Sequence, residues 1–129
     1  MDIDTLYGVD ASKAQGAWLE VAGASFLCKH LNPGSIEWAK TMRDRTKKYR
    51  RIIEADMLSP EDDRKIAIEV FIDVCLLDWK DVIVKGNTVE FSKDNAASLF
   101  KTYPGLYLDV ASAAADIKRF KTEEGDGKN

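Results

Sequence analysis

The side chains suited to metal binding or nucleophilic catalysis are few in this chain. It contains one histidine, His30, and two cysteines, Cys28 and Cys75. Structural zinc sites take four ligands, whereas here the unusual Cys28-x-His30 spacing supplies two, Cys75 supplies a third, and no fourth is apparent. We interpret both cysteines as small apolar residues of the core and His30 as a residue at the surface or at the end of a strand. These residues predict no metal and no cofactor.

The carboxylates that stand near one another in the sequence are Asp62 with Asp63 and Asp78 with Asp81. We expect them near helix ends, where the helix dipole accounts for acidic residues without any catalytic role. The chain also lacks three common signatures, which are Gly-x-Ser-x-Gly, the phosphate-binding Gly-x-x-x-x-Gly-Lys-[Ser/Thr] and the zinc-binding His-Glu-x-x-His. The sequence therefore predicts a protein that is not an enzyme and has no catalytic residues.

Length and composition fit one soluble domain. The chain has 129 residues, of which 45% are apolar and 32% charged. Its longest charge-free stretch, 21–28, is far shorter than the roughly 18 apolar residues that span a membrane. The first four residues include two aspartates where a leader would be basic, so we expect the cytoplasm. We predict a mobile N-terminal arm over 1–16, one globular domain over 17–120 and a disordered tail over 121–129.

The apolar spacing predicts an α+β fold that is predominantly helical. Two apolar runs within 17–31 flank the sequence Ala22-Gly23-Ala24, which indicates a small N-terminal β-hairpin. The stretch 35–57 repeats apolar side chains every three or four residues, which predicts a helix. The residues expected on the inward face of that helix are Ala39, Met42, Thr46, Tyr49 and Ile53.

A second helix is expected to begin at Ser59, which can cap it, with Pro60 in its first position. Apolar residues then cover most of the helix perimeter, so we predict the central helix of the fold from Ser59 to about Trp79. A Gly-Asn turn and two helix-type apolar patterns complete about four helices and a second short hairpin. These remaining elements are the hairpin over 81–91 and the helices over 93–103 and 106–120.

Positive charge is concentrated within the helix predicted over 35–57. The window 40–51 holds seven basic residues and one acidic residue, a net charge of +6, so the remaining residues sum to −9 within the total of −3. Like charges three and four residues apart destabilise an isolated helix, so an acidic neighbour in this chain or another has to offset them. Three interpretations stay open: a solvated helix face, a face that binds a protein, and a nucleic-acid site, which the scarcity of interleaved aromatic residues disfavours.

Several ordered landmarks between residues 17 and 120 resemble one protein family. They are Trp18-Leu19-Glu20-Val21, Lys48-Tyr49-Arg50-Arg51, Leu76-Leu77-Asp78-Trp79-Lys80-Asp81-Val82, Val89-Glu90-Phe91-Ser92-Lys93-Asp94-Asn95-Ala96, Tyr103-Pro104-Gly105-Leu106-Tyr107, and Ala114-Ala115-Asp116 with Phe120. In this order they resemble the tail assembly chaperones of long-tailed bacteriophages (siphoviruses) and of their prophage relatives. The second hairpin departs from that family, which often has Asp-Gly-Lys-Pro-Val where this chain has Lys85-Gly86-Asn87-Thr88-Val89.

The resemblance implies a small, mainly helical protein that does no chemistry. Such a chaperone binds the long tape-measure protein, keeps it soluble and recruits tail-tube subunits around it. It leaves before the tail is complete, so it would act in the cytoplasm of the host bacterium and be missing from the mature virion. Many relatives also have a longer form made by translational frameshifting. The partners implied are therefore the tape-measure protein, the tail-tube protein, a frameshifted longer form of the chain and further copies of the chain itself.

Under this resemblance, basic and apolar side chains would share the work of binding. The basic helix would pair with acidic stretches of a tape-measure protein, and aromatic or apolar side chains would provide anchors. The candidate partner-binding residues are Lys40, Arg43, Lys47, Arg50, Arg51, Trp79, Leu106 and Tyr107. The alternative function is a small nucleic-acid-binding regulator that uses the basic helix 40–51. A membrane partner is not expected.

Overall fold

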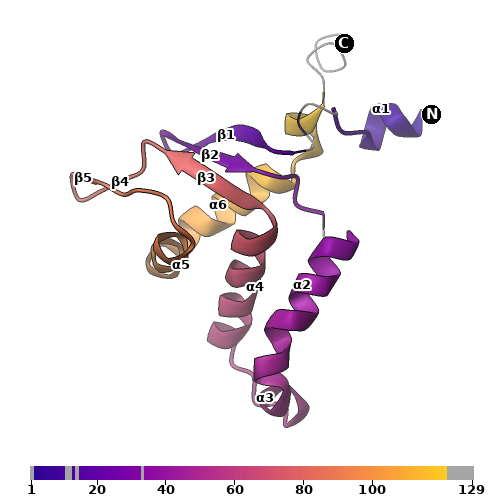
Figure 1. Cartoon of the computed structure of the whole chain (residues 1–129), viewed down its shortest axis with the longest axis vertical. Helices are drawn as coiled ribbons and strands as arrows, with labels where there is room; N and C mark the ends of the chain where they lie inside the picture. Colours follow the sequence, from indigo (N-terminus) through magenta and orange to yellow (C-terminus); the bar gives the residue numbers. More distant parts are fainter. Residues whose placement is uncertain (1, 11–12, 14, 33, 122–129) are drawn as a thin grey trace.

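The computed structural model describes residues 2–10, 13, 15–32 and 34–121 and has an α+β fold in which helices predominate (Figure 1). None of the helices in these ranges has the length and apolar character to cross a membrane. The elements in chain order are α1 (Ile3–Tyr7), β1 (Ala17–Val21), β2 (Ala24–Cys28), α2 (Ile36–Thr46), η2 (Lys47–Tyr49), α3 (Arg50–Glu54), α4 (Pro60–Val74), β3 (Leu76–Lys80), β4 (Ile83–Val84), β5 (Asn87–Thr88), α5 (Lys93–Thr102), α6 (Pro104–Ala115) and η3 (Ile117–Phe120).

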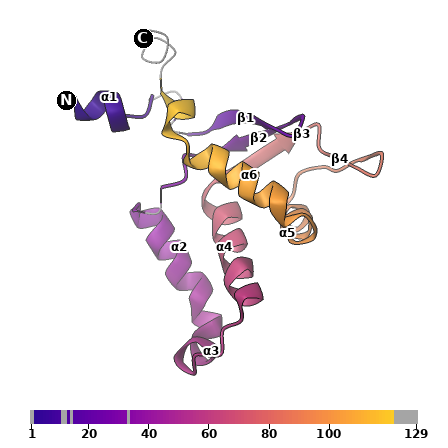
Figure 2. The ribbon, with the colours of Figure 1, turned by 180° about the vertical axis from the view of Figure 1, so that it is seen from behind.

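A three-stranded antiparallel sheet, in the order β1-β2-β3, forms one end of the molecule. Helix α6 crosses one face of this sheet and α5 lies next to α6, as the front and back views show (Figures 1 and 2). Helices α2 and α4 pack side by side and extend away from the sheet as an arm, with α3 at its far end. The molecule therefore has a body, made of the sheet with α5 and α6, and a helical arm.

The predicted hairpin over 17–31 is confirmed. Strands β1 and β2 pair so that Leu19 lies opposite Phe26, and both side chains are buried. The two turn residues, Ala22 and Gly23, have φ angles of 54° and 81°, as two-residue hairpin turns require. Alternation along β1 places Trp18 on the opposite face of the sheet, where it is 45% exposed.

The segment after Ser59 is only in part the helix that the sequence predicts. The Ser59 hydroxyl accepts a hydrogen bond from a backbone N–H of the first turn at 3.0 Å, and Pro60 is the first helical residue, so the predicted start is confirmed. The predicted end is wrong, because α4 stops at Val74 and β3 follows, with Trp79 opposite Phe26 of β2. An unbroken apolar run is compatible with helix and strand alike, and the free edge of β2 selects the strand.

The helix predicted over 35–57 is broken into α2, the 3₁₀ turn η2 and α3. The two helices of the arm are joined at its far end, so the chain has to reverse direction there to bring α4 alongside α2. A straight helix over the whole predicted range would carry the chain away from α4. The break follows from this reversal.

The inward face predicted for this segment is partly wrong. Met42 and Tyr49 do pack against the core. Ala39 is exposed, however, and Ile53 is 41% exposed on α3, beyond the part of the arm where α2 meets α4. The apolar spacing correctly indicated helix over most of 35–57. Helix α4, however, packs against only part of this segment, so the apolar residues beyond it stay exposed.

The second hairpin is confirmed, with strands shorter than the predicted runs. Strands β4 and β5 pair around a turn at Lys85 and Gly86, whose φ angles are 51° and 82°. The indole N–H of Trp79 donates a hydrogen bond to the carbonyl of Val89 at 2.8 Å. This bond fastens the chain after the hairpin to the sheet.

Both C-terminal helices are confirmed, with shifted ends. The Ser92 hydroxyl caps α5 by accepting a backbone N–H at 2.9 Å. Helix α6 begins at Pro104, and its predicted continuation to Phe120 is wrong. At Asp116 the backbone becomes extended, with φ −76° and ψ 101°, and its carboxylate caps the short 3₁₀ helix η3.

The N-terminal residues meet the body near its C-terminal end. The backbone N–H of Asp10 donates to the carbonyl of Phe120 at 2.8 Å, and the Lys13 ammonium donates to the carbonyl of Lys121 at 2.8 Å. The predicted tail 121–129 lies outside the described residues except for Lys121. The mobility predicted for the N-terminal residues 1–16 stays a prediction.

The core lies between the sheet and helices α4, α5 and α6. Its fully buried aromatic residues are Phe26, Phe71, Phe100 and Phe120. Cys28 and Cys75 are fully buried free thiols, which confirms their interpretation as core residues. Burial raises the pKa of both thiols to about 12.

Candidate partner-binding groove

An open groove lies where three connections of the chain meet. These are the β1–β2 turn, the β4–β5 hairpin and the corner between α5 and α6. The groove has a volume of about 830 Å³ and is open to solvent. We refer to it below as the groove.

Each wall of the groove begins at a local change in the backbone. The first wall is the β1–β2 turn with Gly23. The second follows Asp81, whose φ of 63° redirects the chain out of β3 and leaves Ile83 63% exposed. The third starts where α5 ends at Tyr103 and Pro104 opens α6, and Tyr103 is 40% exposed.

The floor of the groove is apolar. Phe26, Val82 and Leu99 line it and are buried, and the half-buried Leu106 lines it from α6. Large apolar side chains that stay exposed around an apolar floor are typical of surfaces that bind other proteins. The groove has this arrangement in Ile83 and Tyr103, together with its floor.

The charged residues of the lining are Asp81, Asp109 and Lys85. A second, more polar hollow of about 430 Å³ adjoins the groove and shares Val21 and Asp109 with it. This hollow adds Glu20, together with Arg119 and Asp116, which pair with each other at 3.8 Å. One side of the groove therefore carries an excess of negative charge.

Of the three apolar residues predicted to bind a partner, the structure places one in the groove. That residue is Leu106. Tyr107 packs its ring against Phe71 and Phe100, with ring centroids 5.7 and 5.6 Å apart, and burial raises the pKa of its hydroxyl. Trp79 is 5% exposed and belongs to the core, so a partner on the surface would not touch it.

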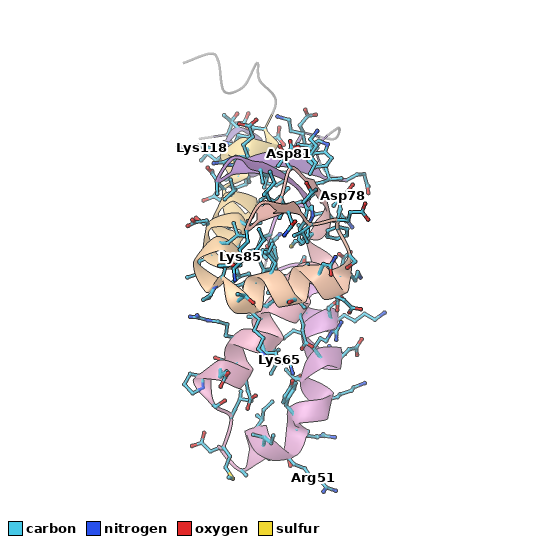
Figure 3. All side chains as sticks on the ribbon, turned by 90° about the vertical axis from the view of Figure 1, so that its left-hand side faces the viewer. Arg51, Lys65, Asp78, Asp81, Lys85 and Lys118 are labelled. Carbon is cyan, nitrogen blue, oxygen red and sulfur yellow. The ribbon has the colours of Figure 1, made fainter. Side chains whose placement is uncertain are left out.

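The basic residues predicted to bind a partner are all exposed and lie elsewhere, along α2, η2 and α3. They are Lys40, Arg43, Lys47, Arg50 and Arg51. Figure 3 shows Arg51 at the far end of the arm, distant from Asp81 and Lys85 of the groove. The structure therefore does not bring the basic and the apolar candidates together.

Two of these basic side chains have acidic neighbours on the same helical stretch. Lys47 pairs with Asp44 at 3.7 Å, and Arg50 pairs with Glu54 at 3.4 Å. Such exposed pairs contribute little to stability. They do show that part of the positive charge is offset locally.

The basic residue that joins the arm together is Arg45, which was not among the candidates. Its guanidinium donates to the Asp73 carboxylate of α4, with Nε 2.8 Å from Oδ2, and also pairs with Glu69 at 3.7 Å. The hydrogen bond to Asp73 is the main cause of the raised pKa of Arg45. Lys93 at the start of α5 reaches the same carboxylate at 3.4 Å. Helix α4 therefore supplies an acidic neighbour to Arg45, one of the seven basic residues of the window 40–51.

Sequence reasoning missed Ile83 and Tyr103 as groove residues. The alternation around Val82 and Ile83 places one side chain inward and the next outward, and this pattern could have identified Ile83. Tyr103 stands directly before the Pro104-Gly105 helix break. No pattern in the sequence shows that these two residues lie around one groove.

Within the part of the chain that the structure describes, no three or more histidine, cysteine, aspartate or glutamate side chains are grouped so that they could hold a metal ion.

Comparison with known proteins gives a match to a protein family. The model of a family described as YdaY prophage protein matches residues 33–128, which is most of the chain. The match includes the arm, the β4–β5 hairpin and the α5–α6 corner, and it begins after the β1–β2 hairpin. No curated protein and no solved structure matches the chain.

Proposed function

We propose that this chain, which belongs to the YdaY prophage protein family, is a tail assembly chaperone that binds a tape-measure protein and does no catalysis. In this role it would keep the tape-measure protein soluble and help recruit tail-tube subunits around it. It would act in the cytoplasm of the host cell and be missing from the finished virion. The family membership supports the phage-related part of this proposal.

The groove is the observation that carries the binding role. It combines an apolar floor with exposed Ile83 and Tyr103, and it contains Leu106, an anchor proposed from the sequence. A chaperone for a long chain has to hold apolar segments that would otherwise associate, and an open apolar groove offers them a surface. The exposed basic side chains of the arm add a second, electrostatic surface that can steer an acidic segment.

The test is co-expression of the chain with the tape-measure protein encoded in the same prophage. We expect the tape-measure protein to move from the pellet to the supernatant and to co-purify with the chain. A tape-measure protein that stays insoluble, with no complex recovered, would contradict the proposal. Adding the tail-tube protein to the recovered complex tests recruitment, and mass spectrometry of purified tails tests whether the chaperone is absent from the virion.

A second candidate is a nucleic-acid-binding regulator, favoured by the exposure of basic side chains along the arm. Lys40, Arg43 and Arg51 are exposed, and none of them forms an ion pair with a residue that the structure describes. Binding through such residues would weaken steeply as salt rises, because each phosphate contact releases a counterion. Gel-shift assays at about 50 mM salt test this candidate, and the absence of any shift there would eliminate it.

A further inference from the structure

We propose that the groove binds an amphipathic helix of a partner protein, with the apolar face of the helix on the groove floor and lysine or arginine residues along one flank. The inference rests on the proposed function in taking the tape-measure protein as the source of that helix. It goes further in naming the surface that binds and the chemistry of the segment that is bound.

The backbone of two groove walls is accessible to a partner. Gly23 stands on one wall and Gly105 on another, and a Cβ atom added at either position would meet no atom within 4 Å. The two walls therefore have open space at the level of the backbone, so a bound helix could approach either wall closely. A helix bound in a groove presents anchors at positions i, i+3, i+4 and i+7. The floor and rim offer apolar contacts in Leu106 and Ile83.

The charge around the groove favours a partner helix that has basic residues along one flank. Asp81 and Asp109 belong to the lining, and Glu20 borders the adjoining hollow. None of these three carboxylates forms an ion pair with another described residue. The basic residue of the groove lining is Lys85. A helix with lysine or arginine on the side of Asp109 would supply the missing counter-charges, and one with acidic residues there would be repelled.

Gly105 allows the groove to be filled without disturbing the fold. Its φ lies outside the left-handed region, and the space above it is open, so Gly105→Leu places a bulky side chain in the groove. The matched control is Ser98→Leu, which adds the same side chain at an exposed position of α5 outside the groove. Asp109→Lys reverses charge in the lining, with Glu90→Lys as its exposed control outside the groove.

The first experiment is retention of the co-expressed tape-measure protein by each variant. We expect Gly105→Leu to lose most of the retained protein and Ser98→Leu to retain as much as the unmodified chain. If the unmodified chain and Gly105→Leu retain it equally, the groove inference is overturned and the proposed function stands. Circular dichroism and thermal unfolding of each variant show whether a loss reflects binding or misfolding, and Asp109→Lys serves if Gly105→Leu misfolds.

The second experiment separates the inference from the proposed function. Two labelled 20-residue synthetic helices, with identical leucine faces and either lysine or glutamate flanks, are titrated with the chain by fluorescence anisotropy. We expect the lysine-flanked helix to bind, with an affinity about tenfold lower for Gly105→Leu, and the glutamate-flanked helix to bind weakly or not at all.

Charge reversal gives a further readout in the same titration. Asp109→Lys should weaken binding of the lysine-flanked helix at about 50 mM salt, with a smaller difference at about 500 mM because of screening. If the tape-measure protein fails to bind the unmodified chain, the proposed function is wrong, and the peptide result alone decides the inference. Equal binding of both peptides, or of one peptide to all variants, would overturn it.

Discussion

Gly105 and Gly23 both line the groove, and both have open space where a Cβ atom would be added. They differ in the backbone, because Gly23 has φ +81° and Gly105 lies in the first turn of α6. Alanine therefore adds the same methyl group at both positions, to a left-handed backbone at Gly23 and to a helical backbone at Gly105. The resulting changes in the free energy of unfolding should have opposite signs.

For Gly105→Ala we expect stabilisation. Alanine restricts the unfolded chain more than glycine does and is the better helix former, which together contribute about 0.5–1 kcal/mol. No steric cost is expected, since the added atom contacts nothing within 4 Å. In a domain of this size the melting temperature should rise by about 2–5 °C.

For Gly23→Ala we expect destabilisation. A left-handed conformation costs an alanine about 1–2 kcal/mol. The restricted unfolded chain offsets about 0.4–1 kcal/mol of this cost. The net loss is then about 0.8 kcal/mol from the middle of these two ranges, with about 1.6 kcal/mol as the upper bound.

Urea unfolding at 25 °C, followed by tryptophan fluorescence and circular dichroism, measures both variants against the unmodified chain. The slopes of the transitions should agree, so that the midpoints report stability alone. A destabilised Gly105→Ala would mean that the space beside α6 is filled or that the helix begins later. If both variants change the free energy of unfolding in the same direction, backbone conformation is not what distinguishes the two glycines, and the reasoning is refuted.

Three further changes test the core and the arm. Arg45→Ala should lower the free energy of unfolding by about 1–2 kcal/mol, because it removes a charge-assisted hydrogen bond to Asp73 between α2 and α4; a urea midpoint equal to that of the unmodified chain would contradict this. Trp79→Phe should cost about 1–2 kcal/mol by leaving a backbone carbonyl without its indole donor, and the loss should disappear if that hydrogen bond does not form in solution. Since burial raises the pKa of Cys28 and Cys75 from 9.0 to about 12, both thiols favour the folded state fully below pH 9 and lose that contribution as pH rises towards 12. Native protein at pH 8 should accordingly react with a disulfide reagent only after unfolding in guanidinium, and rapid labelling of the native protein would contradict the burial of the two thiols. The fall in stability above pH 9 should be smaller when both cysteines are replaced by alanine.

Local signals in the sequence predicted the helix starts. The predicted cap at Ser59 is confirmed, and Ser92 caps α5 in the same way, since each hydroxyl accepts a hydrogen bond from the first turn of its helix. Such interactions lie within three residues, so their outcome depends little on the rest of the fold. The Ala22-Gly23 turn was predictable for the same reason, since the turn conformation is set by its own residues.

Elements that depend on distant partners were not predictable in this way. The strand β3 arises because β2 offers an unpaired edge earlier in the chain, so that Trp79 pairs with Phe26, 53 residues before it, instead of continuing α4. The same pairing moves Trp79 from a proposed binding residue to a core residue. Leu106 was proposed as an anchor under the family resemblance, but Ile83 and Gly23 reach the same groove from other parts of the chain.

The backbone around the groove indicates a preformed site. Among the described non-glycine residues, positive φ angles occur at four positions, and three of them, Ala22, Asp81 and Lys85, lie in the groove lining. Left-handed backbone is costly for most side chains and persists only where surrounding structure holds it. Here the β1–β2 pairing holds the first turn, and the Trp79 hydrogen bond to Val89 helps hold the chain that follows the second hairpin. Because two walls are fixed by these contacts before any partner arrives, little ordering of the groove should be needed on binding, and more of the contact energy remains available for affinity.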